Sequence, residues 1–216
     1  MTAAEKTARA DRAGATRDVI LETAERLFAE HGVFGVSNRQ ISEAAGQGNN
    51  AAVGYHFGTK TDLVRAIVRK HTEQVEQLRA RRLAELGPEP NIRDWLTCLI
   101  RPQTEHLAQS GPPTWFARFG AQVMTDPGLR KIMAEESLSS PSLLQIIDGL
   151  KLSLPALPAE VQRERGDMAR LLMVHLLAEY ERGLADGTPV PRASWDETAT
   201  GLIDALAGLW TAPVTR

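Results

Sequence analysis

Cysteine is nearly absent from this chain of 216 residues, which has Cys98 alone. One thiol excludes an intramolecular disulfide framework and a site built from several thiolates, and it suits a reducing compartment. Cys98 lies in an apolar run that begins at Trp95 and ends at Ile100, so we expect a buried small side chain. The sequence also lacks the His-Glu-x-x-His spacing of a zinc site, and we expect neither a metal ion nor another cofactor.

Long hydrophobic runs are missing as well. No stretch approaches the roughly 20 apolar residues that a membrane span needs, and the first 17 residues lack the apolar region of a secretory signal. We therefore expect a cytoplasmic protein that does not associate with a membrane.

Strand patterns are also lacking, because no run alternates apolar and polar residues between turn signals. Apolar residues instead recur at helical spacing, as Ile20, Ala24, Leu27 and Phe28 do, which predicts an all-α protein. Glycine and proline clusters separate the segments, and Pro102 should kink or split the one that holds it. The predicted helices cover residues 16–31, 38–45, 49–55, 60–86, 90–109, 113–125, 127–137, 141–152, 158–185 and 194–211.

The charge is small overall, at −2, but it is unevenly spread. Residues 1–82 hold 13 basic and 10 acidic side chains, whereas residues 83–216 hold 12 and 17. The first third of the chain is therefore the part suited to phosphate groups, although a solvated helical face would show the same bias.

A helix-turn-helix pattern stands in that first third. Ser37 precedes a short helix as its N-cap, Ile41, Ala44 and Ala45 should face inward, and Gly46 supplies the positive φ of a tight turn. The next helix is short and has a surface of small residues, which can approach base edges in the major groove closely. The pattern predicts a unit that reads double-stranded DNA.

The residues of this region resemble the DNA-binding domain of the TetR family of bacterial transcriptional repressors. The resemblance covers about residues 16–68 and rests on the segment from Thr23 to Gly32, then on Ser37, Ile41, Ala44, Ala45, Gly46, Tyr55, His56, Phe57, Lys60 and Leu63. It implies a three-helix helix-turn-helix domain (15–62). Residues 1–14 before it are polar and show no apolar period, so we expect a flexible basic arm there. A long helix would join this domain to a C-terminal helical domain for ligand binding and dimerisation (63–216).

The resemblance also implies which side chains meet an operator. Those nearest the bases would be Arg39, Asn50, Ala51, Ala52 and Gly54. Those along the phosphates would be Tyr55, His56, Thr59 and Lys60, with Thr16 and Arg17 clamping the backbone. The free amides that follow Thr59 at a helix start, together with Lys60, independently suit a phosphate. Outside such a motif, Tyr55 and His56 would simply pack against the first helix.

The second domain contains aromatic and thioether side chains able to line a pocket. The predicted ligand-binding residues are Trp95, Leu99, His106, Trp115, Phe116, Phe119, Met133 and His175. Few charges accompany them, so the unknown small-molecule ligand should be mostly apolar. Plain core packing would explain the same residues.

The last two predicted helices carry wide apolar stripes that could pair two subunits as a four-helix interface. One stripe consists of Met168, Leu171, Leu172, His175, Leu176 and Tyr180, and the other of Leu202, Ala205, Leu206, Leu209 and Trp210. Both stripes could instead serve the internal core.

These patterns together favour a ligand-responsive repressor that acts as a homodimer at the nucleoid and is not an enzyme. A helical enzyme is the first alternative, because Glu105 with His106, and His175 with Glu179, are possible acid–base pairs. A helical adaptor that binds no DNA is the second.

Overall fold

The chain folds into α-helices joined by turns. The computed structural model describes residues 3–49 and 51–214, and no strand occurs in these ranges, which confirms the all-α prediction. No helix within them is both long and apolar enough to cross a membrane. The described helices are α1 (Ala3–His31), α2 (Asn38–Ala44), α3 (Ala52–Phe57), α4 (Lys60–Ala84), α5 (Ile92–Gln109), α6 (Phe116–Thr125), α7 (Pro127–Leu138), α8 (Pro141–Ser153), α9 (Ala159–Asp186) and α10 (Trp195–Thr211).

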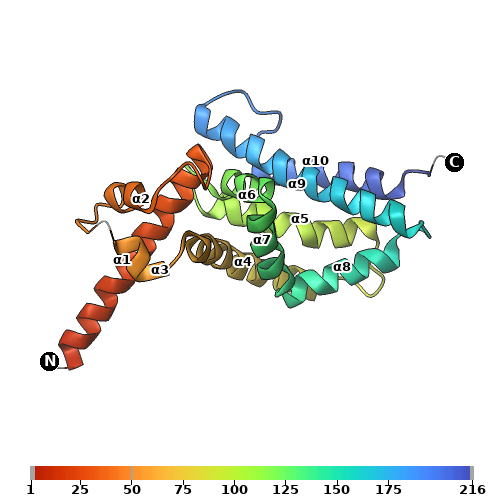
Figure 1. The fold of residues 1–216 in the computed structure, drawn as a ribbon. Coiled ribbons are helices and arrows are strands. Elements are labelled where there is room, and N and C mark those ends of the chain that lie inside the picture. The colour runs from red at the N-terminus through yellow and green to blue at the C-terminus, as the bar shows by residue number, and fades with distance from the viewer. Residues whose placement is uncertain (1–2, 50, 215–216) are drawn as a thin grey trace.

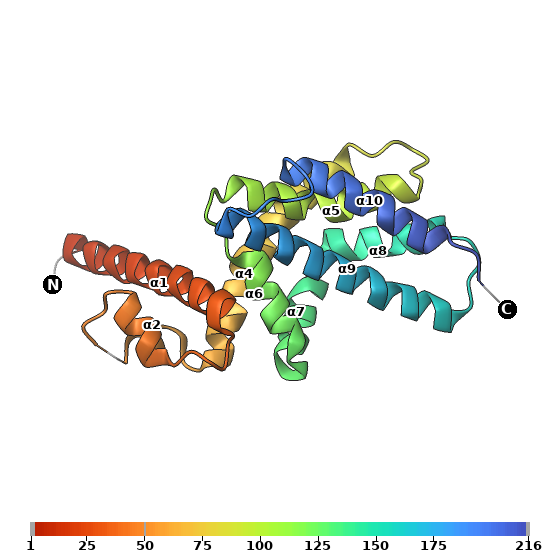
Figure 2. The ribbon, with the colours of Figure 1, turned by 90° about the horizontal axis from the view of Figure 1, so that it is seen from above.

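The first helix is longer than the sequence predicted. Residues 1–14 were expected to form a flexible arm, but α1 begins at Ala3 and runs without a break to His31. The segment from Ala3 to Ala13 is rich in alanine, glutamate, lysine and arginine, all strong helix formers, so the helix continues despite its lack of an apolar face. The end of α1 that carries the N-terminus points away from the C-terminal helices (Figures 1 and 2).

The N-terminal helices share one apolar core with part of the C-terminal region. Ile20 and Phe28 of α1, Ile41 of α2 and Leu63 of α4 are fully buried in it. Phe119 of α6 belongs to the same core, and its ring centroid lies 6.3 Å from that of Phe28. The core therefore continues across the predicted domain boundary, so α6 and the N-terminal helices pack directly against each other.

A second core lies among α5, α9 and α10. Leu96 and Ile100 of α5 pack there with Leu202 and Leu206 of α10. Helices α9 and α10 run side by side toward the end of the molecule opposite the free end of α1 (Figures 1 and 2). Pro102 is buried within α5 and does not split it, contrary to one expectation, because the helix is held on several sides by α4, α8 and α10.

Side-chain caps set where several helices begin. The Ser37 side chain accepts a hydrogen bond from the amide of Gln40 at the start of α2, and Thr59 does the same from Asp62 at the start of α4. Both caps are reciprocated by the residue three positions on, which satisfies two backbone donors at each start. These two starts position the elements of the helix-turn-helix.

Candidate functional site

Helices α2 and α3 are joined by a tight turn with the predicted glycine. Gly46 has φ of +66°, and the amide of Gln47 donates to the carbonyl of Ser42 at 2.9 Å. Ile41 and Ala45 are buried as predicted, whereas Ala44 is exposed because Ala45 lies one full turn after Ile41 and takes the core-facing place. Helix α3 begins at Ala52 rather than near residue 49.

Most of the predicted DNA contacts are accessible. Tyr55 is 80% exposed, and Arg17, Arg39, Ala51, Gly54 and Thr59 are exposed as well. Thr16, His56 and Lys60 are half-buried, while Ala52 is buried and packs inward. Asn50 lies outside the described residues. The structure thus brings together a surface made by α2, α3 and the start of α4, and the individual contacts stay predictions.

Arg39 projects from α2 with its charge paired on the same helix. Its Nε donates to Oε1 of Glu43 at 2.7 Å, and this hydrogen bond raises the pKa of Arg39 above its ordinary value. Both side chains are largely exposed, so the pair is weak and water competes with it. A base edge could therefore replace Glu43 as the partner of Arg39.

The start of α4 already carries its own negative charge. The Thr59 hydroxyl and amide both donate to the carboxylate of Asp62, at 2.6 and 3.0 Å. The hydroxyl bond is the main cause that lowers the pKa of Asp62, so this carboxylate stays ionised beside the predicted phosphate position. Sequence reasoning missed it, although the Thr-x-x-Asp spacing signals such a cap.

Lys60 bridges two parts of the N-terminal domain. Its ammonium donates to the carbonyl oxygens of Val33 at 3.1 Å and Val36 at 2.5 Å, both in the segment between α1 and α2. The start of α4 is thereby tied to the entry of the helix-turn-helix. The phosphate contact predicted for Lys60 stays a prediction and would compete with these bonds.

Replacing Lys60 by methionine should lower the free energy of unfolding by about 1 to 3 kcal/mol, because two partly buried carbonyls lose their donor. Urea unfolding followed by circular dichroism measures the loss. Lys131→Met is the control, since Lys131 is exposed and its ion pair with Glu135 is long, at 3.9 Å. Equal stability of the two variants would show that water replaces the Lys60 ammonium at no cost.

The aromatic residues predicted to line a ligand pocket pack mainly in the interior. Phe119 is fully buried, and Trp115, Phe116 and Met133 pack against the same core. The ring of Trp95 lies against Gly149 of α8, where a β-carbon would come within 2.3 Å of it. Leu99 packs against the second core, and His175 is exposed on α9.

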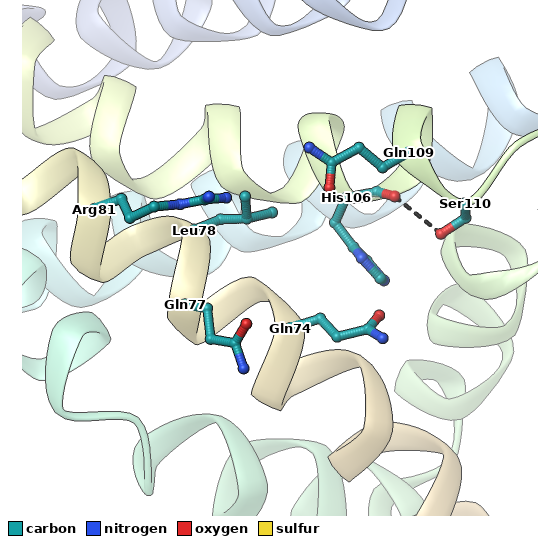
Figure 3. A pocket seen from close by; sticks show the side chains of 7 residues that line it. All are labelled: Gln74, Gln77, Leu78, Arg81, His106, Gln109 and Ser110. Carbon is teal, nitrogen blue, oxygen red and sulfur yellow. Dashed lines mark hydrogen bonds between the residues drawn. The ribbon is translucent and has the colours of Figure 1, made fainter.

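A polar pocket of about 350 Å³ lies between α4 and α5. It is lined by Gln74, Gln77, Leu78, Arg81, His106, Gln109 and Ser110. Figure 3 shows these residues on the two neighbouring helices, with the His106 ring directed from α5 toward α4. Of the predicted ligand-binding residues, His106 alone lines this pocket. Sequence reasoning missed the other six lining residues. Their helical spacing was nevertheless a signal, because positions 74, 77, 78 and 81 share one face of α4, and positions 106, 109 and 110 share one face of α5.

Within the described ranges, no group of three histidine, cysteine or carboxylate side chains is placed to hold a metal ion. Helices α2 and α3, the Gly46 turn between them and the capped start of α4 place the protein in the helix-turn-helix class.

Comparison with known proteins defines the family. A model described as bacterial regulatory proteins of the tetR family matches residues 20–67, and one described as a tetracyclin repressor-like C-terminal domain matches residues 97–208. The second match alone spans more than half of the chain. The chain therefore belongs to the TetR family.

Among curated relatives, the HTH-type transcriptional repressor AcnR of Corynebacterium efficiens is 36% identical over 87 residues. The match covers 38% of this chain and 46% of AcnR, so it spans about half the length of that relative.

Solved structures show the same fold over nearly the whole chain. The TetR family transcriptional regulator PfmR from Thermus thermophilus superposes with a TM-score of 0.55 at 18% identity and covers 93% of this chain and 97% of PfmR. A protein from Saccharomonospora viridis, described as a transcriptional regulator and solved with choline, has a TM-score of 0.55 at 22% identity and covers 90% and 96%.

Proposed function

We propose that this protein is a sequence-specific DNA-binding transcriptional regulator that acts as a repressor and is released from its operator by a small molecule. The observation that carries the proposal is the exposed surface that α2 and α3 form on either side of the Gly46 turn. Small side chains there let the backbone approach a major groove, and Tyr55 and Arg39 project beside them. The AcnR resemblance supports the same role, which would be exercised in the cytoplasm at the nucleoid and requires no enzymatic activity.

In this proposal, Arg39 meets a base edge, with Asn50, Ala51 and Gly54 close to the neighbouring bases. Tyr55, His56 and Thr59 follow the phosphates, and Thr16 and Arg17 hold the backbone from α1. The guanidinium carbon of Arg17 lies 4.8 Å above the ring centre of Phe57, which orients the side chain while leaving it exposed. Ala52 supports this surface from within, because it is buried.

We further propose a homodimer through α9 and α10. Met168, Leu171 and His175 are exposed along α9, and Ala205 and Gly208 along α10, which leaves a small-residue and apolar face without an internal partner. Only part of the two predicted stripes belongs to this exposed face, because Leu202, Leu206 and Tyr180 are buried inside the subunit. Two operator half-sites would then meet two copies of the helix-turn-helix.

The ligand proposed here differs in character from the mostly apolar molecule that the sequence predicted. The pocket between α4 and α5 is lined chiefly by amide, hydroxyl, imidazole and guanidinium groups. A small polar molecule would satisfy more of these groups than an apolar one.

A search for bound DNA across the genome, followed by mobility shifts with the fragments recovered and with the region upstream of the protein's own gene, tests the function. Saturable binding that depends on sequence supports it. The helical-enzyme and adaptor alternatives both predict that no fragment is bound specifically.

Arg39→Ala should weaken binding to the cognate operator by about 1 to 3 kcal/mol and relax the preference at one base pair per half-site. The reason is the loss of a bidentate contact, for which guanine O6 and N7 are the best-matched acceptors. Titrations against cognate and point-substituted operators measure both effects. Glu43→Gln is the control, since it frees Arg39 from its pair and should keep the preference. Equal weakening on every sequence would place Arg39 on the phosphates.

A further inference from the structure

Three buried polar side chains form a continuous hydrogen-bonded series between the two domains. Glu25 Oε2 lies 2.8 Å from Nε2 of His71, and Nδ1 of His71 lies 2.6 Å from Nε2 of His106. All three residues are between 4% and 7% exposed. They come from α1, α4 and α5, so the series reaches from the helix-turn-helix domain into the C-terminal helices.

Packing holds the middle of this series in place. The His71 ring stacks on Phe116 of α6, with centroids 3.8 Å apart and an angle of 12° between the planes. Phe116 in turn stacks on Phe119, which lies in the core shared with α1. The His71 ring can therefore gain or lose a proton while it keeps its position.

The same three positions accommodate two proton arrangements. In the neutral form, His71 donates from Nε2 to the Glu25 carboxylate and accepts at Nδ1 from His106, which leaves Nδ1 of His106 as a free acceptor. With one more proton, His71 is an imidazolium that donates to both neighbours. His106 must then accept at Nε2 and carry its own proton on Nδ1, where it becomes a donor.

His106 also lines the pocket between α4 and α5, so one residue belongs to both features. Arg81, an exposed side chain, lines the same pocket and has no ion-pair partner within the described residues, and none of the lining residues is acidic. Gln74, Gln77 and Gln109 add amide groups around it (Figure 3). Glu105 accepts a hydrogen bond from Gln109 of the lining at 3.1 Å, but its charge is paired with Arg82 at 3.0 Å. Arg81 is then the uncompensated charge at the pocket and favours an anionic ligand.

We propose that this pocket is the effector site for a small carboxylate, bound at Arg81 and His106, and that the series His106, His71, Glu25 reports its occupancy to α1. The inference rests on the proposed function. A carboxylate beside His106 stabilises the arrangement with a proton on Nδ1, and that arrangement needs the imidazolium at His71. Binding therefore takes up a proton from solvent and turns the contact with Glu25 of α1 into a full ion pair.

The geometry places the added proton on His71 rather than on His106, because His71 lies 2.8 Å from the Glu25 carboxylate whereas Nε2 of His106 faces another imidazole. Burial, with smaller contributions from His71 and Lys70, lowers the pKa of His106 to about 4, so it stays neutral. Lys70 of α4 faces Glu22 of α1 at 3.4 Å, and Arg82 of α4 binds Glu105 of α5 at 3.0 Å, so these neighbours are compensated. From α6, the ring of Phe116 is what meets His71. Glu25 is thus the carboxylate that stabilises the added proton.

Calorimetry on the full-length protein tests the site with succinate and benzoate as carboxylate probes and choline as a cationic probe. Titrations are run between about pH 6 and pH 8, a range in which histidine changes its charge, and in buffers of different ionisation enthalpy. Carboxylate affinity should fall by up to about tenfold for each unit that the pH rises, since binding takes up one proton. Glu25→Gln should abolish that slope, whereas Asp18→Asn, on the exposed face of the same helix and away from Lys70, should keep it.

Arg81→Gln should weaken carboxylate binding by about 10- to 100-fold, whereas Arg130→Gln on α7 should leave it unchanged. Saturating succinate should lower operator affinity in the wild type and not in Arg81→Gln. The proposal is overturned if neither carboxylate binds, if choline binds in their place, if the slope survives in Glu25→Gln, or if succinate leaves operator affinity unchanged. Operator binding without ligand is measured separately. A protein that binds carboxylates with this slope but binds no DNA retains the site and loses the proposed function.

Discussion

Replacing Arg118 by methionine is expected to lower the free energy of unfolding by about 3 to 5 kcal/mol, because it leaves a buried carboxylate without its cation. Nε of Arg118 donates to Oε2 of Glu181 at 3.2 Å, and the two residues are only 6% and 1% exposed. Glu181 of α9 also accepts from the amides of Ala117 and Arg118 in the first turn of α6, so the pair joins these helices. Chemical unfolding of wild type and variant measures the difference.

Arg182→Met is the matched control for that experiment, since it removes the same kind of side chain from a nearby ion pair at the surface. Arg182 and Glu179 lie 3.4 Å apart and are largely exposed, so their loss should cost less than about 1 kcal/mol. If Arg118→Met costs no more than this control, the α6 amides alone satisfy Glu181.

Leu171→Glu should convert the proposed dimer into monomers and lower operator affinity by about 10²- to 10⁴-fold, because two linked half-site contacts become independent. Leu171 is 47% exposed on α9, so the substitution spares the core, yet it places a charge from each subunit in the proposed interface. Light scattering reports the mass, and mobility shifts report the affinity.

Leu144→Glu provides the comparison for the dimer test. Leu144 lies on α8, outside the proposed interface, and is 44% exposed, so it carries a similar change in a similar environment. It should stay dimeric and bind the operator as the wild type does. A Leu171→Glu protein that remains dimeric would place the interface elsewhere. Leu206 is unsuitable for this test because it is 1% exposed and lies in the second core.

Local signals made most of the helix boundaries predictable. Ser37 and Thr59 cap helices where the sequence placed them, and Gly46 adopts the positive φ that the turn requires. Such features depend on a few neighbouring residues, so they can be read from the chain directly. The predicted start of α1 was wrong because the segment from Ala3 to Ala13 has helix propensity but no apolar face, and propensity alone is a weak signal.

Long-range pairing could not be predicted in this way. Apolar spacing places Leu206 and Leu171 on faces of their helices, but it does not decide which face meets the core and which meets solvent. Glu25, His71 and His106 are far apart in the chain and meet only because α1, α4 and α5 dock together. The same docking buries Phe119 and leaves the polar side of α4 and α5 around the pocket.

The bonds from Lys60 to the carbonyls of Val33 and Val36 give α4 the properties of a lever. Its 25 residues span about 38 Å at 1.5 Å per residue. The pocket residues Gln74 to Arg81 lie about 21 to 32 Å along the helix from Lys60, so a tilt of about 5° there would carry the start of α4 through about 2 to 3 Å, close to the length of one hydrogen bond. Because the helix-turn-helix is fastened to that end, the proposed release from DNA would need only an angular change of this size to take a base contact out of reach.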